Sequence, residues 1–335
     1  MKVHYSSTAR FFIVVSLLTF SLSAVAQTCF TSDDMDAATK TALQTTALRF
    51  FDLVSKGDSA SLQQNSIPAV ATNFSGIENT IKDNQADLAG AHATMRPPFE
   101  LKAEGTAPIE RAEFLCGIFN GPDADKAAEI IIPNLPPGNY AVTILDVQGQ
   151  KSPYTLTFVL QQQGTDWKLG GFFLHAEQIA GHNSDWFLQK ARDFKSKGQN
   201  HNAWLYYLQA RDLAMPISFL YTKTTDGMYQ EEQTVRPSDF PIDGSIADVA
   251  GANGKTYQIT AVFPLAVQGK LDLVVKYRNP DISNSGQTFE ENTNVMRAML
   301  AKFPELREAF DDMVVRAVEP SGRDYGSMMP MKDIK

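Results

Sequence analysis

A helical period of hydrophobic residues marks residues 184–216, in the middle of the chain. Its apolar positions are Phe187, Ala191 and Phe194, followed by Ala203, Tyr207, Ala210 and Ala214. Gly198 suits the left-handed position that ends a helix, and Pro216 stops the next one because it lacks a backbone amide. The pattern therefore predicts two helices joined by a short turn, a helical hairpin.

The region before the hairpin changes from a helical to an alternating pattern. Apolar residues recur at helical spacing in a long helix at about residues 33–57, and shorter helices follow near 60–65 and 77–88. Strands are expected at residues 99–105, 110–119, 128–132, 140–147, 154–162 and 167–176. The last of these is apolar on both faces, which predicts a central strand covered on both sides, and Gly170-Gly171 within it indicates a bulge.

The region after the hairpin alternates strands with one clear helix. Strands are expected at residues 217–222, 257–263, 271–276 and 314–318, and residues 226–255 form a polar loop. Thr288 and Glu291 have the spacing of a capping box, which opens an amphipathic helix. The whole chain is thus predicted to be α+β, with helices packed on a curved antiparallel sheet, then a helical hairpin, then a small C-terminal α+β unit.

The first 26 residues have the three parts of a secretory signal peptide. Lys2 and Arg10 precede the apolar run at residues 11–23, and Ala24-Val25-Ala26 supplies an A-x-A cleavage site. A lipoprotein and an uncleaved anchor are the alternatives, although Gln27-Thr28 before Cys29 is unlike a lipidation site. We expect cleavage near Ala26, a secreted or periplasmic location and no later membrane span.

The predicted domains are therefore a signal peptide at residues 1–26, an α+β domain at 27–180, the hairpin at 181–216 and a C-terminal α+β domain at 217–335. The formal net charge is −8, and the loss of two basic residues with the signal peptide takes it to −8 − 2 = −10. Nucleic acids and anionic lipids need concentrated basic residues, which the sequence lacks. We therefore expect neither as the main partner.

The two cysteines, Cys29 and Cys116, are expected to form a disulfide. Exported proteins meet an oxidising compartment, where a matched pair usually bridges. A catalytic pair is the alternative, but the C-x-x-C spacing of redox sites is absent. The bridge would pin the start of the first domain to its sheet.

Candidate proton-transfer residues in the first domain are His92, Asp146 and His175. A metal site could combine His175 with Glu177 and His182, but the spacing matches no common ligand motif. We expect no metal and no cofactor, and for each histidine the plainer interpretation is a ring with one hydrogen bond.

Two resemblances to known families rest on short stretches. The helix end with Phe50, Phe51 and Gly57-Asp58, together with the strand Trp167–Phe172, resembles the cystatin-like, ketosteroid-isomerase-like cone. That resemblance implies helices over a curved sheet and an apolar pocket, which in different members isomerises, hydrolyses, binds a ligand or mediates assembly.

The hairpin resembles a single tetratricopeptide repeat in its order of aromatic and small residues. It departs from that pattern at Lys190, where leucine is usual, and no second copy follows. A lone repeat must bury its apolar stripe on something else, so we expect the hairpin to dock on its neighbouring domains.

Three hypotheses for function follow. The leading one is a non-catalytic exported module that binds a small apolar ligand or a protein of the cell envelope. The second is a cone-type isomerase or hydrolase that uses His175 or Asp146. The third is an assembly scaffold that acts through an exposed hairpin face carrying Trp204 and Tyr206. The sequence leaves the oligomeric state open.

Overall fold

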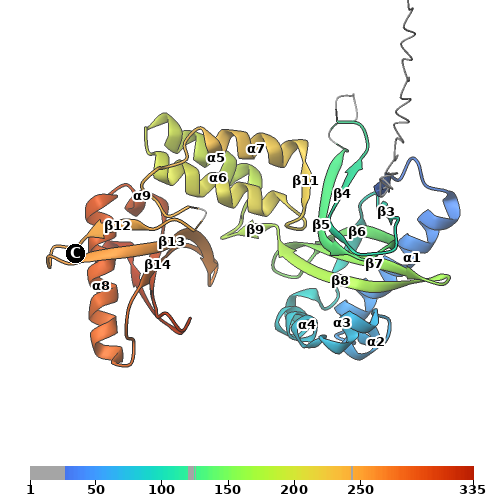
Figure 1. The fold of residues 1–335 in the computed structure, drawn as a ribbon, viewed down its shortest axis with the longest axis horizontal. Helices are drawn as coiled ribbons and strands as arrows, with labels where there is room; N and C mark the ends of the chain where they lie inside the picture. The colour runs from blue at the N-terminus through green and yellow to red at the C-terminus, as the bar shows by residue number, and fades with distance from the viewer. Residues whose placement is uncertain (1–26, 120–123, 125, 243) are drawn as a thin grey trace, which may run out of the picture.

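The computed structural model describes residues 27–335 except 120–123, 125 and 243. The expected signal peptide at residues 1–26 therefore lies outside the described residues. The fold is α+β, as predicted. Figure 1 shows an N-terminal unit and a C-terminal unit at opposite ends of three helices. We call these helices the helical layer; they are α5 (Ser184–Ser196), α6 (Asn200–Ala214) and α7 (Lys223–Gln233).

A six-stranded antiparallel sheet, here called the central sheet, organises the N-terminal unit. Its order is β1-β3-β6-β7-β8, and β2 also pairs with β6. The strands are β1 (Gln27–Phe30), β2 (His92–Met95), β3 (Phe99–Ala103), β6 (Gly138–Gln148), β7 (Pro153–Gln163) and β8 (Asp166–Ala176). Between β7 and β8 the register shifts beside Gly170, which confirms the predicted bulge. Among the described strands β8 pairs with β7 alone, so the prediction that it is central is wrong.

Four helices pack on one face of the central sheet. They are α1 (Ala37–Ser55), α2 (Ser59–Gln64), α3 (Pro68–Thr72) and α4 (Ser75–Leu88). The long helix begins later than expected because Asp36 caps it by accepting a hydrogen bond from the Thr39 amide. Phe50 of α1 and Phe158 of β7 meet edge to face in the core between these helices and the sheet.

A second sheet of three strands covers the other face of the central sheet (Figure 1). Its order is β11-β5-β4, with β4 (Ile109–Cys116), β5 (Ala128–Leu135) and β11 (Leu220–Thr222). The sequence placed residues 217–222 in the C-terminal part, but β11 pairs with β5 in the N-terminal unit. Burial of Ile217 and Leu220 in the core between the two sheets explains this return of the chain.

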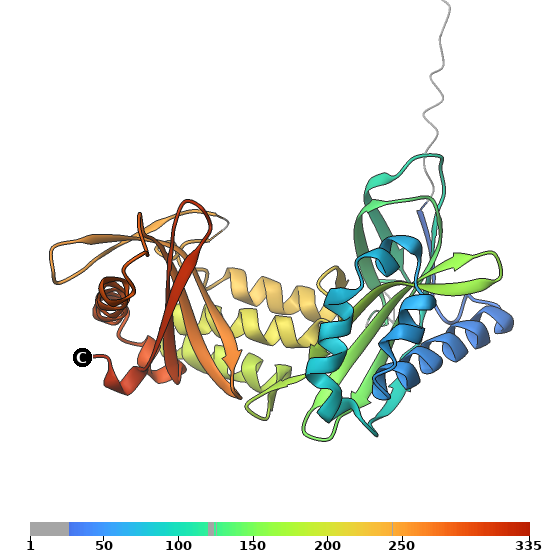
Figure 2. The same ribbon diagram turned by 90° about the horizontal axis from the view of Figure 1, so that it is seen from below.

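The hairpin of α5 and α6 buries its apolar stripe with the C-terminal unit. Phe187, Ala191 and Phe194 belong to the same buried cluster as the C-terminal strands and α8 (Ser285–Lys302). Docking on a neighbouring unit is therefore confirmed. Figure 2 shows the C-terminal sheet between α8 on one side and the helical layer on the other.

The C-terminal sheet has the order β12-β13-β14-β15-β16. Its strands are β12 (Ala247–Ala250), β13 (Thr256–Val267), β14 (Lys270–Arg278), β15 (Asp312–Val318) and β16 (Asp324–Pro330). The parallel strands β14 and β15 are connected through α8 and α9 (Leu306–Ala309). Asn284, and not the expected Thr288, caps α8.

The polar loop expected at residues 226–255 is wrong in part, because most of α7 and all of β12 lie within it. Thr222 and Thr225 form a capping box that starts α7. Only Thr225, Met228 and Glu232 of this helix are buried, so its apolar period is too sparse to stand out in the sequence.

Candidate ligand-binding site

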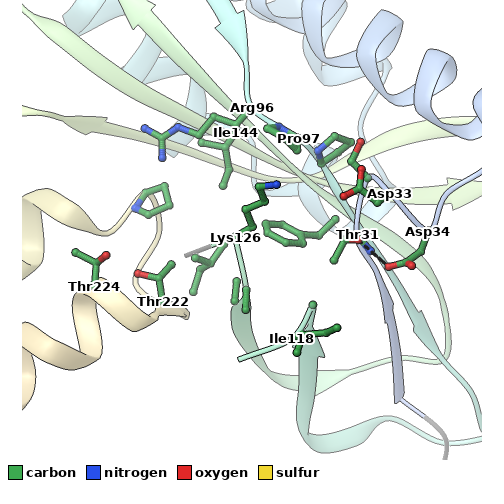
Figure 3. Close-up of a pocket in the computed structure, with 18 of the residues that line it drawn as sticks. Thr31, Asp33, Asp34, Arg96, Pro97, Ile118, Lys126, Ile144, Thr222 and Thr224 are labelled. Atoms are coloured by element: carbon green, nitrogen blue, oxygen red, sulfur yellow. Dashed lines mark hydrogen bonds between the residues drawn. The ribbon is translucent and has the colours of Figure 1, made fainter. Parts of the chain in front are cut away.

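A cavity of about 650 Å³ lies where the N-terminal unit meets the ends of α6 and α7. The loop after β1, the link between β2 and β3 and the tips of β4 and β5 form most of its wall. The chain from Ala214 to Thr224 closes the remaining side (Figure 3). Segments from distant parts of the sequence therefore build one hollow.

Apolar side chains form much of the cavity. Phe99 of β3, Ile144 of β6 and Leu220 of β11 line it from the space between the two sheets. Ile118, which follows β4, contributes a side chain that is 71% exposed. An isoleucine so exposed at the mouth of a hollow offers apolar surface to a second molecule.

Polar groups line facing sides of the same cavity. Figure 3 shows Asp33, Asp34 and Lys126 around the cavity, with Thr222 and Thr224 across from them. Asp34 accepts hydrogen bonds from the backbone amide and the hydroxyl of Thr31. The hydroxyl and then the amide of Thr31 lower the pKa of Asp34 below its usual value, so this carboxylate is ionised at neutral pH.

The disulfide holds two sides of this cavity together. Cys29 of β1 and Cys116 of β4 are bonded, with Cα atoms 5.1 Å apart, which confirms the predicted pair. Thr31 follows two residues after the first cysteine, and Gly117 directly follows the second; both line the cavity. The bridge thus fixes the loop after β1 beside the tip of β4.

The sequence candidates Asp146 and His175 lie in one row across three strands of the central sheet. Asp146 of β6 is opposite Thr155 of β7, and Thr155 is opposite His175 of β8. Residues opposite one another in a sheet share a face, so the structure brings the two candidates to the same surface with a threonine between them.

Most side chains in this row are already engaged in hydrogen bonds or an ion pair. Arg96 approaches Oδ1 of Asp146 with its Nε at 2.8 Å and its Nη2 at 2.5 Å. The same guanidinium lies 3.6 Å from Glu177, which accepts a 2.6 Å hydrogen bond from the Thr155 hydroxyl. In Figure 3 the guanidinium of Arg96 is turned away from the centre of the cavity. Asp146 is therefore not poised as a base toward the cavity.

His175 faces a different hollow. It lines a cavity of about 350 Å³ together with Asp212 and Met215 at the end of α6. Its Nε2 atom is buried and has no hydrogen-bond partner. The third candidate, His92, is exposed on β2 opposite Gln148 and lines neither cavity.

The alternative metal site is not assembled. His182 stacks on Trp186 with ring centroids 3.8 Å apart, and Glu177 is engaged by Thr155 and Arg96. Across the described residues, no group of three or more His, Cys, Asp or Glu side chains could hold a metal ion.

The expected exposed face of the hairpin is wrong. Trp204 and Tyr206 are only 5% and 6% exposed, because α6 is covered by α5, by Phe240 and by the segment around α9. The Tyr206 hydroxyl donates a 2.5 Å hydrogen bond to the Ala309 carbonyl, and burial raises the pKa of Tyr206. These two rings stabilise the C-terminal core and are not available at the surface.

No family model, curated protein or solved structure matches this chain. The two family resemblances therefore stay predictions. In the part of the chain that the structure describes, none of the helices is both long enough and apolar enough to cross a membrane.

Sequence reasoning missed the residues that build the main cavity. Asp33 and Ile118 stand in loops and Thr224 in the first turn of α7, and nothing local in the sequence indicates that these segments meet. The Cys29–Cys116 pair is the one feature of the sequence that points to the cavity, because the disulfide brings residues near 31 and 117 together.

Proposed function

We propose that this chain is an exported, non-catalytic binding protein that holds a small amphipathic molecule in the 650 Å³ cavity. The observation that carries this proposal is the cavity itself, with its apolar interior and polar wall. Sites for small molecules typically measure about 300–1,000 Å³ and combine mostly apolar walls with a few polar groups. The cavity has that size and that chemistry.

The distribution of side chains suggests how the ligand lies. Its apolar part packs on Phe99, Ile144 and Leu220, and its polar end meets the wall that carries Asp33 and Lys126. Burial of apolar ligand surface supplies most of the affinity, while the polar groups set its orientation.

The Cys29–Cys116 disulfide supports export, because such bonds persist in oxidising compartments. It agrees with the signal peptide expected at residues 1–26. A secreted or periplasmic location is therefore part of the proposal.

The enzyme alternative rests on one observation, the buried and unpartnered Nε2 of His175 beside the smaller cavity. A general base needs a free nitrogen within reach of a substrate. If a substrate screen gave turnover that His175→Ala abolished and His175→Gln did not restore, the non-catalytic proposal would be wrong.

The chain offers a matched pair of variants for testing the main cavity. Ile118 and Leu115 are both large, exposed apolar residues, at 71% and 65%, on the same stretch of chain, but only Ile118 lines the cavity. Because both side chains are exposed, replacement of either by aspartate should leave the fold intact.

Binding of the amphipathic probe 1-anilinonaphthalene-8-sulfonate, followed by fluorescence titration, compares the two variants. We expect Ile118→Asp to weaken binding at least about tenfold, since loss of one apolar contact and gain of a charge each cost on the order of 1 kcal/mol or more. Leu115→Asp should bind like the unmodified chain. Equal affinities for both variants would refute the assignment of the site.

A further inference from the structure

A second large cavity lies in the C-terminal unit. Figure 1 shows this unit and the N-terminal unit at opposite ends of the helical layer. The cavity measures about 630 Å³ and is bounded by β13 and by the loops that follow β14 and β15. Among its lining residues are Gln258, Arg278, Asn279 and Glu319. A neighbouring hollow of about 410 Å³ shares the segment from Arg278 to Pro280. Arg278 therefore stands between two hollows.

Arg278 carries a positive charge that no described residue compensates. It is the last residue of β14 and is exposed, and its guanidinium makes no hydrogen bond, ion pair or ring contact with the described part of the chain. By contrast, the nearby Arg316 is held by Asp324 through two hydrogen bonds of 2.7 Å. The guanidinium of Arg278 is thus available to another molecule, whereas that of Arg316 is already paired.

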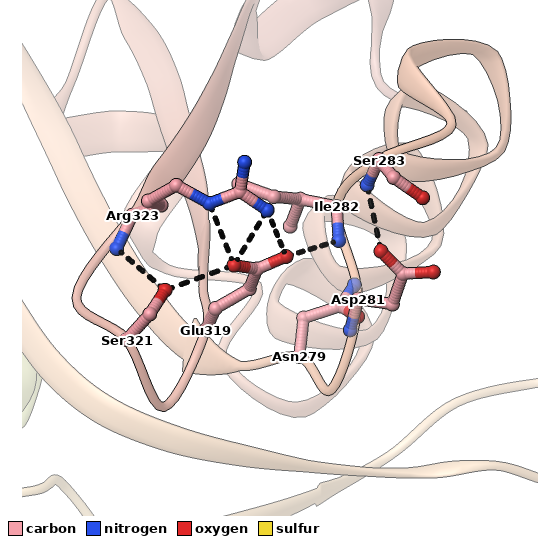
Figure 4. A network of polar contacts seen from close by, with 7 residues as sticks. All are labelled: Asn279, Asp281, Ile282, Ser283, Glu319, Ser321 and Arg323. Carbon is pink, nitrogen blue, oxygen red and sulfur yellow. Dashed lines mark hydrogen bonds and ion pairs between the residues drawn. The ribbon is translucent and has the colours of Figure 1, made fainter.

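The acidic residue of the same cavity, Glu319, is already neutralised. Arg323 donates to its two oxygens from Nε at 2.9 Å and from Nη2 at 3.0 Å, and the Ile282 amide donates at 2.9 Å (Figure 4). These donors lower the pKa of Glu319, the Ile282 amide most of all. The charge left over in the cavity is therefore positive, in a chain whose net charge is −8.

The same network fixes the shape of the cavity wall. Glu319 ties the loop after β15 to the loop after β14, and the Asn279 amide donates a 2.9 Å hydrogen bond to the Val318 carbonyl. Within the loop after β14 the amides of Asp281 and Ser283 donate to the side chains of Asn279 and Asp281, respectively (Figure 4). These hydrogen bonds already hold the two loops in place. Binding of a ligand therefore costs little conformational entropy, which favours affinity.

We propose that Arg278 binds a carboxylate or phosphate group of a small ligand in this cavity. The planar guanidinium donates two parallel hydrogen bonds to either group. The Gln258 side chain also lines the cavity and is a further donor. The position, beyond the carboxyl ends of the parallel strands β14 and β15, is a common place for ligands in sheets with parallel strands.

Titration with inorganic phosphate and, separately, with acetate at constant ionic strength tests this site. The readout is the NMR resonance of the Arg278 side-chain Nε–Hε group, with the backbone amides of Asn279 and of residues 281–283 as reporters in variants. We expect a saturable shift, and we expect Arg278→Gln to reduce the affinity at least about tenfold. A response to phosphate alone would identify a phosphate ligand, and a response to acetate of similar strength a carboxylate ligand.

Two further variants separate this site from general charge effects. Arg111→Gln removes an exposed arginine of the N-terminal unit that pairs with Glu113, and it should leave the titration unchanged. Arg323→Gln breaks the clamp on Glu319 and should weaken binding less than Arg278→Gln does. No saturable shift, an undiminished shift in Arg278→Gln, or a larger loss in Arg323→Gln would each overturn the proposal.

Discussion

The two units bury their apolar side chains in different ways. In the N-terminal unit the central sheet separates two apolar clusters, a disulfide joins the sheets at one edge, and a cavity opens at the border of the second cluster. In the C-terminal unit one cluster extends through the sheet, α8 and the hairpin. The hairpin thus shares its core with one unit, while the strand that follows it pairs in the other.

This difference explains where the ligand site lies. A sheet that is covered by helices on one face and by a second sheet on the other leaves an open rim where the two layers diverge. The chain from Pro216 to Thr222 closes that rim, and the Thr157 hydroxyl of β7 donates a 3.2 Å hydrogen bond to the Pro216 carbonyl. The cavity therefore depends on contact between the N-terminal unit and the helical layer.

The largest expected loss of stability comes from removing an aromatic side chain of the α5–α6 hairpin. Phe187→Ala should cost about 3 to 5 kcal/mol, because the side chain is fully buried against Trp186 and Tyr206. Hydrogen exchange measured by mass spectrometry should show faster exchange in α5, α6 and the C-terminal sheet. Phe158→Ala is the matched control and should act on β6 to β8 instead. Faster exchange in β6 to β8 of Phe187→Ala would contradict the assignment of the hairpin to the C-terminal core.

Removal of the disulfide should have the next largest effect. The double variant Cys29→Ser with Cys116→Ser opens a loop with a sequence separation of 87 residues. The chain-entropy model gives at most about 4 to 5 kcal/mol for a loop of this size, and we expect roughly 2 to 4. Urea unfolding should show the loss in the N-terminal unit alone. An equal loss of stability in the C-terminal unit would mean that the two units unfold together.

The smallest expected effect on stability concerns a buried carboxyl group of the C-terminal unit. Asp272 of β14 is 1% exposed, and neither of its carboxylate oxygens has a hydrogen-bond partner. Burial, and then the charges of Asp312 and Asp311, raise the pKa of Asp272 above the ordinary 3.8. The Asp312 backbone amide, which lies near the carboxylate without a well-formed hydrogen bond, and then Lys270 oppose this shift. The charged form of Asp272 is thus the less stable one in the folded chain.

The sign of the pH dependence follows from that direction. A raised folded pKa means that the stabilisation by protonated Asp272 is complete below pH 3.8 and is lost as the pH rises through the folded pKa. Asp272→Asn should therefore gain stability relative to the parent with rising pH, by about 1 kcal/mol at neutral pH. Urea unfolding of both proteins between pH 4 and pH 8 measures this difference. A difference that shrinks with rising pH would contradict the account.

Local patterns predicted those parts of the fold whose burial follows a regular period. The stripe of Phe187, Ala191 and Phe194 is buried as expected, because a narrow apolar face must find a partner. Strand β7 alternates large apolar residues with smaller ones, and the bulge at Gly170 follows from a residue without a side chain. The disulfide was predicted because an exported chain with two cysteines meets an oxidising compartment, where such a pair usually bridges.

Other features depended on contacts that the sequence does not show. The destination of β11 is set by pairing with β5, almost a hundred residues earlier in the chain. The burial of Trp204 and Tyr206 did carry a signal, since five consecutive apolar residues at 203–207 indicate a helix covered on all sides. The cavity has no such local signal, because its wall combines loops with residues of strands and of α7 that meet only in the folded chain.

Native mass spectrometry of the exported chain tests the central proposal most directly. The unmodified protein and Leu115→Asp should each carry the same small-molecule adduct, and Ile118→Asp should lack it, because only that change alters the cavity. The same adduct on all three proteins would place the ligand elsewhere, and no adduct on any of them, together with unchanged probe binding in Ile118→Asp, would contradict a binding role for the cavity.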